Sequence, residues 1–105
     1  MRPQKGAAAM LTMQEIEQAV SLLLQKYDAQ SALLFGSYAR GEATDASDLD
    51  LVLYGGAHFK KTNIFAFAEE LRQKTGKEVD AFEISELEQG TPFYDAVMRE
   101  GIKIA

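Results

Sequence analysis

The chain has 105 residues, a formal net charge of −5 at pH 7, one histidine and no cysteine. This length fits one domain with a modest core, and the lack of cysteine excludes a disulfide framework and a thiolate metal site. The acidic balance argues against long nucleic acid as the main ligand, because proteins that bind it usually carry a basic surface.

The first segment of the chain, MRPQKGAAAM, is basic but lacks the apolar centre of a signal peptide. No apolar run approaches the roughly 20 residues that span a bilayer, so we expect a cytoplasmic protein. We predict a flexible tail over residues 1–11 and a single domain over residues 12–105. Thr12 to Glu15 has the spacing of a capping box, and apolar residues recur behind it at helical period, which predicts a helix over residues 12–27.

The next elements are short. SALLF, residues 31–35, is apolar and stops at a glycine, which predicts a buried strand. A short helix is expected from Ser37 to about Gly41. LDLVLY, residues 49–54, predicts a second strand that ends at two glycines.

A third helix is predicted to begin at a cap formed by Thr62 or Asn63 and to end at Gly76. KEVDAFEI, residues 77–84, alternates between apolar and polar residues and predicts a third strand.

The last helix is expected to begin at Thr91 and Pro92, which supply a cap and a first-turn proline, and to run to about Glu100. Residues 102–104 are expected to add a short final strand. The alternation of helices and strands predicts a sheet covered by helices, in a small layered domain of α/β or α+β class.

Two aspartates, Asp48 and Asp50, lie at the start of the second predicted strand. Residues two apart on a strand point to the same face, with α-carbons about 6–7 Å apart, while Leu49 and Leu51 take the opposite face. Two ionised carboxylates this close repel each other, which raises their pKa values unless a cation intervenes. Mg²⁺ prefers oxygen ligands and leaves room for phosphate, so the pair predicts a magnesium site.

A third acid, Asp80, lies inside the third predicted strand between two apolar residues. If that strand lies beside the second, Asp80 completes a cluster of three carboxylates, which can hold two metal ions about 3.5–4 Å apart for phosphoryl or nucleotidyl transfer. The alternative is an edge-strand charge that faces water. Glu78 and Glu83 compete for the role, but Glu78 is not flanked by apolar residues on both sides.

The pair Gly36-Ser37 follows the first predicted strand and opens a short helix. Glycine lets a phosphate approach the backbone, and the exposed N–H groups and the serine hydroxyl favour an anion. Arg40, about one turn later, can supply a cation for the same phosphates. The alternative for Arg40 is a solvent-facing ion pair with Glu42 or Asp45.

The stretch GSYARGEATDASDLDLVLY resembles the signature of the DNA polymerase β-like nucleotidyltransferase superfamily, in which Gly-Ser is followed by a spacer and Asp-x-Asp; here the spacer has ten residues. The ARG after Gly-Ser and the SDLDL run are similar to the minimal nucleotidyltransferase (MNT) family. The likeness extends over nearly the whole chain from about residue 12 and includes the closing REGIKI segment. It implies an α+β fold, a small mixed β-sheet with helices packed mainly on one face.

The resemblance also implies roles for single residues. Gly36 and Ser37 match the residues that position the triphosphate. Asp48 and Asp50 match the metal-binding pair, and Asp80 matches the third acid, a metal ligand and base toward the acceptor hydroxyl. These three acids are therefore the expected catalytic residues.

The activity implied by the resemblance is transfer of a nucleoside monophosphate, with ATP as substrate and two Mg²⁺ ions as cofactors. Many members are encoded beside a HEPN-domain protein, a helical RNase toxin, for which the MNT protein is the antitoxin and which it can adenylylate, often on tyrosine. One alternative is a small-molecule enzyme, such as an aminoglycoside nucleotidyltransferase. Another is a non-catalytic antitoxin that acts by binding, against which the three acids argue, because a binder needs no converging carboxylates.

Overall fold

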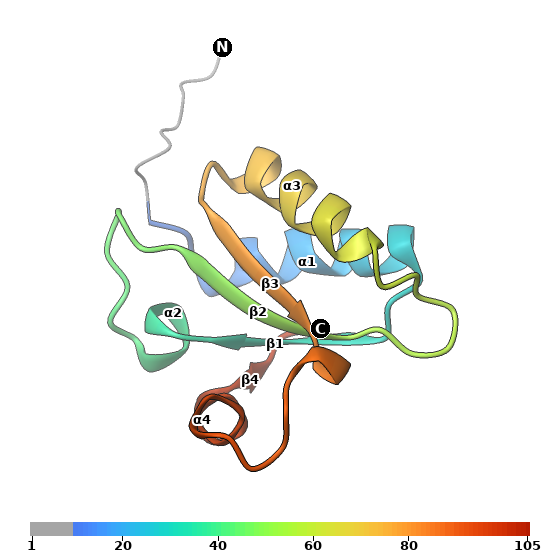
Figure 1. Ribbon diagram of the computed structural model, residues 1–105. Helices are drawn as coiled ribbons and strands as arrows, with labels where there is room; N and C mark the ends of the chain where they lie inside the picture. Colours follow the sequence, from blue (N-terminus) through green and yellow to red (C-terminus); the bar gives the residue numbers. More distant parts are fainter. Residues whose placement is uncertain (1–9) are drawn as a thin grey trace.

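A mixed four-stranded sheet organises the part of the chain that the computed structural model describes, residues 10–105 (Figure 1). The strand order is β3-β2-β1-β4. β1 (Ser31–Phe35) pairs antiparallel with β2 (Leu49–Tyr54) and with β4 (Ile102–Lys103), whereas β2 and β3 (Val79–Glu83) are parallel. The predicted α+β class and mixed sheet are confirmed.

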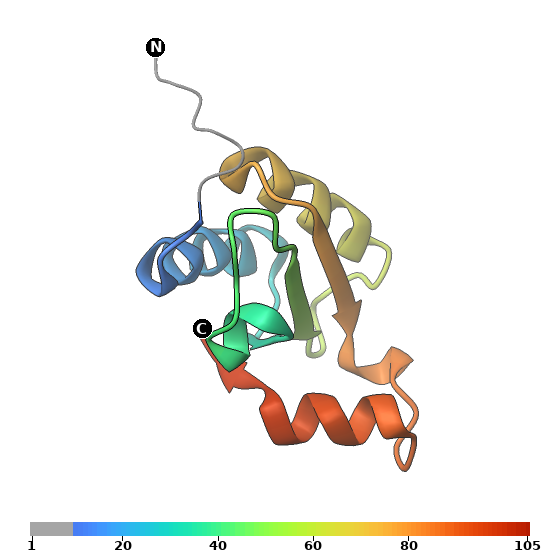
Figure 2. The same ribbon diagram turned by 90° about the vertical axis from the view of Figure 1, so that its left-hand side faces the viewer.

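The helices lie unequally on the two faces of the sheet. α1 (Met13–Tyr27) and α3 (Asn63–Thr75) pack together on one face, and α4 (Pro92–Glu100) lies on the opposite face (Figures 1 and 2). α2 (Ser37–Arg40) follows β1, and a single 3-10 turn, η1 (Ile84–Glu86), follows β3. The expected arrangement, with helices mainly on one face, is confirmed.

The start of α1 has the predicted capping box. The Thr12 N–H donates to Oε1 of Glu15 at 2.8 Å, and the Glu15 N–H donates back to the Thr12 hydroxyl at 3.1 Å. These bonds satisfy N–H groups that have no partner inside the helix. Of the predicted tail, residues 1–9 lie outside the described residues, while Leu11 is partly buried against the core and its N–H donates to the Tyr38 hydroxyl at 3.2 Å.

The main core lies between the sheet and the pair α1–α3. Alternate residues of β1 and β2 point into it, as the period of a strand requires. Its fully buried members include Ile16, Val20, Ala32, Leu34, Leu49, Leu51, Leu53, Phe67 and Leu71. Because these positions face the helices, the intervening residues of each strand face the other side of the sheet, where the acids of β2 and β3 lie.

α3 begins after its cap Thr62 and ends at Gly76, as predicted, although the Thr62 side chain makes no capping hydrogen bond. The bounds of the third predicted strand differ from the structure. β3 is shorter than predicted at both ends. At its start Lys77 turns inward and its ammonium donates to the carbonyl of Asp45, and at its end the Glu83 carboxylate accepts from the backbone of Ser85 and starts η1.

Among the described residues, no helix combines the length and the apolar character that crossing a membrane requires.

Candidate active site

Two of the three predicted acids, Asp50 and Asp80, meet on the sheet face that points away from the main core. Asp50 of β2 is the register partner of Asp80 on the parallel strand β3, and of Phe35 on the antiparallel strand β1. The second and third strands are therefore neighbours, as the prediction for Asp80 required. Asp50 and Asp80 form a facing pair built by the ladder itself.

The electrostatics of Asp50 show how close these groups are. The pKa of Asp50 is raised from an ordinary 3.8 to about 6, mainly by burial and then by the negative charges of Asp80 and Asp48. A hydrogen bond between the carboxyl groups of Asp50 and Asp80 also favours the protonated form of Asp50, whereas the positive charge of Arg40 opposes the shift. Repulsion of this kind is what a bound cation relieves.

Asp48 stands apart from this pair. It lies one residue before β2, at the end of the loop that connects α2 to the sheet, and its side chain is exposed. Within residues 10–105, no group of three or more His, Cys, Asp or Glu side chains lies close enough together to hold a metal ion as it stands. The sheet thus places only two of the three expected carboxylates, those of Asp50 and Asp80. The position of the third, Asp48, depends on a loop.

The donor set still fits a hard divalent cation. Two facing carboxylates on adjacent strands, with a third carboxylate two residues before Asp50, supply the oxygen ligands that Mg²⁺ prefers. The competing acid Glu83 is used elsewhere: it is 5% exposed and accepts from the N–H of Gly55 at 3.2 Å and of Ser85 at 2.9 Å, and its pKa is lowered despite burial.

Gly36 connects the predicted phosphate loop to the acids. Its φ of 76° and ψ of −154° belong to a region that only glycine adopts readily. A Cβ atom at Gly36 would lie 2.3 Å from Oδ2 of Asp50. The carboxylate of Asp50 therefore rests against the Gly36 backbone, immediately before half-buried Ser37, and the two halves of the sequence signature form one continuous surface.

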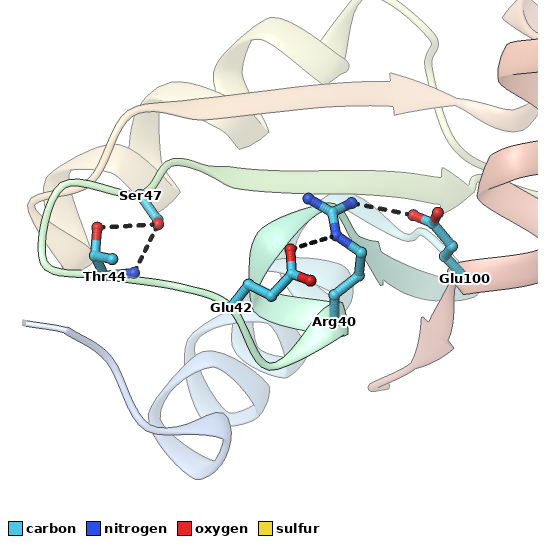
Figure 3. A network of polar contacts seen from close by, with 5 residues as sticks. All are labelled: Arg40, Glu42, Thr44, Ser47 and Glu100. Atoms are coloured by element: carbon cyan, nitrogen blue, oxygen red, sulfur yellow. Dashed lines mark hydrogen bonds and ion pairs between the residues drawn. The ribbon is translucent and has the colours of Figure 1, made fainter.

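Arg40 lies at the end of α2 and bridges two acids (Figure 3). Its Nε is 2.9 Å from Oε1 of Glu42, and its Nη1 is 3.2 Å from Oε1 of Glu100 on α4. The ion pair with Glu42 is one of the two that the sequence suggested. Glu100 was not anticipated, since it lies 60 residues away and carries no local signal.

An aromatic cluster borders the acid pair. The ring of Phe93, from α4, makes edge contacts with the rings of Phe35 and Phe82, with centroids 5.7 and 5.6 Å away. Phe35 lies in the row of Asp50, and Phe82 follows Asp80 by two residues on the same strand. Phe93 thus forms an apolar wall beside the acids. The sequence alone did not predict that this residue lies at the site.

The loop before β2 is closed by a turn. The Thr44 N–H donates to the Ser47 hydroxyl at 2.8 Å (Figure 3). The Ser47 N–H donates to the Thr44 carbonyl at 3.0 Å. A hollow of about 280 Å³ separates this turn from the chain that leaves α3, between residues 45–48 and 76–78.

A family comparison places this site among known proteins. The family model described as polymerase beta, nucleotidyltransferase matches residues 17–105. The chain belongs to this family. The predicted resemblance is confirmed, and the chain is a nucleotidyltransferase, as the sequence indicated.

Individual proteins show the same likeness. The chain is 33% identical over 70 residues to "Putative protein adenylyltransferase MJ0435" of Methanocaldococcus jannaschii, covering 67% of this chain and 75% of that protein. A solved structure named "Structure of putative minimal nucleotidyltransferase" matches with a TM-score of 0.72 and 27% identity, over 90% of this chain and 97% of the other. A complex of a tri-AMPylated HEPN toxin from Shewanella oneidensis with its MNT antitoxin matches with a TM-score of 0.68 and 20% identity, over 90% of this chain and 72% of the other.

Proposed function

We propose that this nucleotidyltransferase is the antitoxin of a toxin–antitoxin pair and that it transfers AMP from ATP to a tyrosine hydroxyl of a cognate HEPN toxin in the cytoplasm. The observation that carries the proposal is the contact between the two halves of the signature. The carboxylate of Asp50 faces Asp80 and rests on the Gly36 backbone, so acids and phosphate loop share one site. The relative named for protein adenylylation and the toxin complex supply the class of acceptor.

The phosphates of ATP are assigned to the turn at Gly36 and Ser37. The missing side chain of Gly36 lets a phosphate approach the backbone beside Asp50. Ser37 adds a hydroxyl and a backbone N–H. Arg40 is assigned to the same phosphates, because it lies one turn later and its charge already reaches Asp50.

The metal ligands are assigned to Asp48, Asp50 and Asp80. Their carboxylates fit two Mg²⁺ ions, which when bound neutralise phosphate charge and orient the triphosphate. The raised pKa of Asp50 supports this assignment: burial and then the charges of Asp80 and Asp48 disfavour its ionised form, and a cation bound between the acids favours that form again.

Asp80 is assigned as the base. It is exposed and lies on β3, an edge strand of the sheet, so a macromolecular acceptor can reach it from outside. The acceptor oxygen gives its proton to Asp80 and forms a bond to the α-phosphorus of ATP. The bond from that phosphorus to the bridging oxygen of the β-phosphate breaks, and pyrophosphate leaves with the electron pair.

The direct test incubates the protein with the protein encoded by its neighbouring reading frame, ATP and Mg²⁺, and measures the intact mass of the partner. A gain of one or more AMP units on tyrosine is expected. The control is α,β-methylene ATP, in which the bond to be broken is blocked. No gain in mass, with toxin neutralisation that survives loss of all three acids, would instead assign a binding antitoxin, and transfer only to an aminoglycoside would assign a small-molecule enzyme.

A further inference from the structure

The loop over residues 41–48 decides where Asp48 lies. The ladder of β2 and β3 fixes Asp50 and Asp80, but Asp48 precedes the ladder and is exposed. The site therefore has two acids set by the sheet and one set by a loop. A residue that holds this loop therefore limits how far Asp48 can move from the pair.

The turn at the tip of the loop is held from outside by Lys77. Inside the turn, Thr44 and Ser47 bond to each other. Of the hydrogen bonds found among residues 10–105, the one that reaches this turn from another segment runs from the Lys77 ammonium to the Asp45 carbonyl. Figure 2 shows the loop rising beside the chain that leaves α3, where Lys77 lies.

The backbone at Lys77 is held in place by hydrogen bonds. Its N–H donates to the Thr75 hydroxyl at 3.2 Å, and that hydroxyl donates to the Leu71 carbonyl at 2.8 Å in the last turns of α3. The residue after Lys77 continues the connection, because the carbonyl of Glu78 accepts from the N–H of Leu49 at 2.9 Å. The chain that follows α3 is thus bonded to the loop at Asp45 and to the first residue of β2 at Leu49.

The burial of Lys77 calls for an explanation. The residue is only 4% exposed. Lysine is almost never fully buried unless it is paired, because removing an ammonium from water costs several kcal/mol. An apolar side chain would fill the same space without that cost. The ammonium is useful here because it can hold a carbonyl that an apolar group cannot.

We propose that Lys77 is a positioning residue for the metal site: its ammonium holds the Asp45 carbonyl, and this limits how far the loop can carry Asp48 from the pair of Asp50 and Asp80. A hollow of about 280 Å³ lies between the two segments, lined by residues 45–48 and 76–78. The inference rests on the proposed role of Asp48 as a metal ligand, and not on the identity of the acceptor.

The test measures binding rather than turnover. Calorimetry follows the binding of α,β-methylene ATP as a function of Mg²⁺ concentration in the wild type, Lys77→Met and Lys77→Arg. Lys77→Met is expected to need roughly tenfold more Mg²⁺ for half-saturation, the usual effect of removing support from a metal ligand. Lys77→Arg keeps a charged donor and is expected to restore most of the loss. Lys74→Met, at an exposed lysine in the last turn of α3, is the matched control and should bind as the wild type does.

Two further measurements show whether Lys77 acts through Asp48. The amides of Ala46 and Ser47 should exchange hydrogen faster in Lys77→Met than in Lys74→Met. In an Asp48→Asn background, Lys77→Met should add little further loss, because residues that act through one another are not additive. If Lys77→Met does not fold, Lys77→Gln, which is too short to reach the carbonyl, replaces it in every comparison.

An unchanged Mg²⁺ requirement in a folded Lys77 variant overturns the inference, and so does an undiminished effect in the Asp48→Asn background. A wild-type protein that binds no nucleotide with Mg²⁺ overturns the proposed function itself. Failure to modify a HEPN partner, with Mg²⁺-dependent binding intact and sensitive to Lys77, overturns only the choice of acceptor.

Discussion

Asp50 lies where three constraints meet. It faces Asp80 across the ladder, rests on the backbone of Gly36 and lies within the field of Arg40. The residue types at this point were predictable from the sequence. A Gly-Ser pair followed by acids at the start of a strand indicates a site for metal ions and phosphate groups. The contact itself was not, because no local pattern reveals that the backbone at Gly36 must approach a particular carboxylate.

The raised pKa of Asp50 predicts a stability that depends on pH in the metal-free protein. The folded state binds a proton up to about pH 6, whereas an unfolded aspartate loses it near 3.8, so the free energy of unfolding falls as the pH rises between these values. Asp50→Asn removes this effect. The variant should be more stable than the wild type at pH 8, by roughly 1–3 kcal/mol after allowance for screening, and equal to it below pH 4.

Urea unfolding in the presence of a chelator at pH 4, 6 and 8 measures this difference. A gap between the two proteins that stays constant over the range, or an Asp50→Asn variant that is less stable at pH 8, would contradict the assigned environment of Asp50.

Gly36→Ala should damage the site and the fold together. Its Cβ would meet Oδ2 of Asp50 at 2.3 Å, at a φ of 76° that alanine rarely adopts. Gly41→Ala is the matched control, with a φ of 73° but nothing within 4 Å of the added atom. Both variants carry backbone strain of about 1–3 kcal/mol, but thermal unfolding should show a larger loss for Gly36→Ala. Loss of Mg²⁺-dependent nucleotide binding in Gly41→Ala, rather than in Gly36→Ala, would refute this account of the loop.

At the scale of elements, local sequence patterns predicted most of the helices and strands. The capping box of Thr12 and Glu15 places the start of α1, and the apolar runs over residues 31–35 and 49–54 coincide with β1 and β2. The prediction was too long for β3, because tertiary contacts of Lys77 and Glu83 end the strand at both sides. Alternation alone cannot report contacts of this kind.

The packing of α4 is predicted to depend on one aromatic residue. Phe93 contacts two other rings and is 44% exposed, whereas Phe65 on α3 is 77% exposed. Phe93→Ala should lower the free energy of unfolding by about 1–3 kcal/mol, through lost ring contacts and lost apolar burial. Phe65→Ala should change it by less than about 0.5 kcal/mol. Equal losses for the two variants, measured by urea unfolding, would show that α4 is not held in this way.

At the scale of the whole molecule, the site is assembled from segments that are distant in the sequence. β1, β2 and β3 bring the acids and the phosphate loop together, and α4 adds the wall of Phe93 and the partner of Arg40. The sequence signature predicted the acids and the loop because they lie on consecutive elements. Glu100 and Lys77 could not be predicted, since they act across 60 and 32 residues of chain through the tertiary fold.

The measurement that tests this account most directly is transfer of label from α-labelled ATP to the partner protein by the wild type and by the double variant Asp48→Asn, Asp50→Asn. The variant should remain folded, since asparagine at position 50 removes a buried charge rather than creating one. We predict transfer by the wild type and none by the double variant, because two of the three carboxylates that we assign to the metal ions are lost. Full transfer by a folded double variant would contradict the assignment of this site.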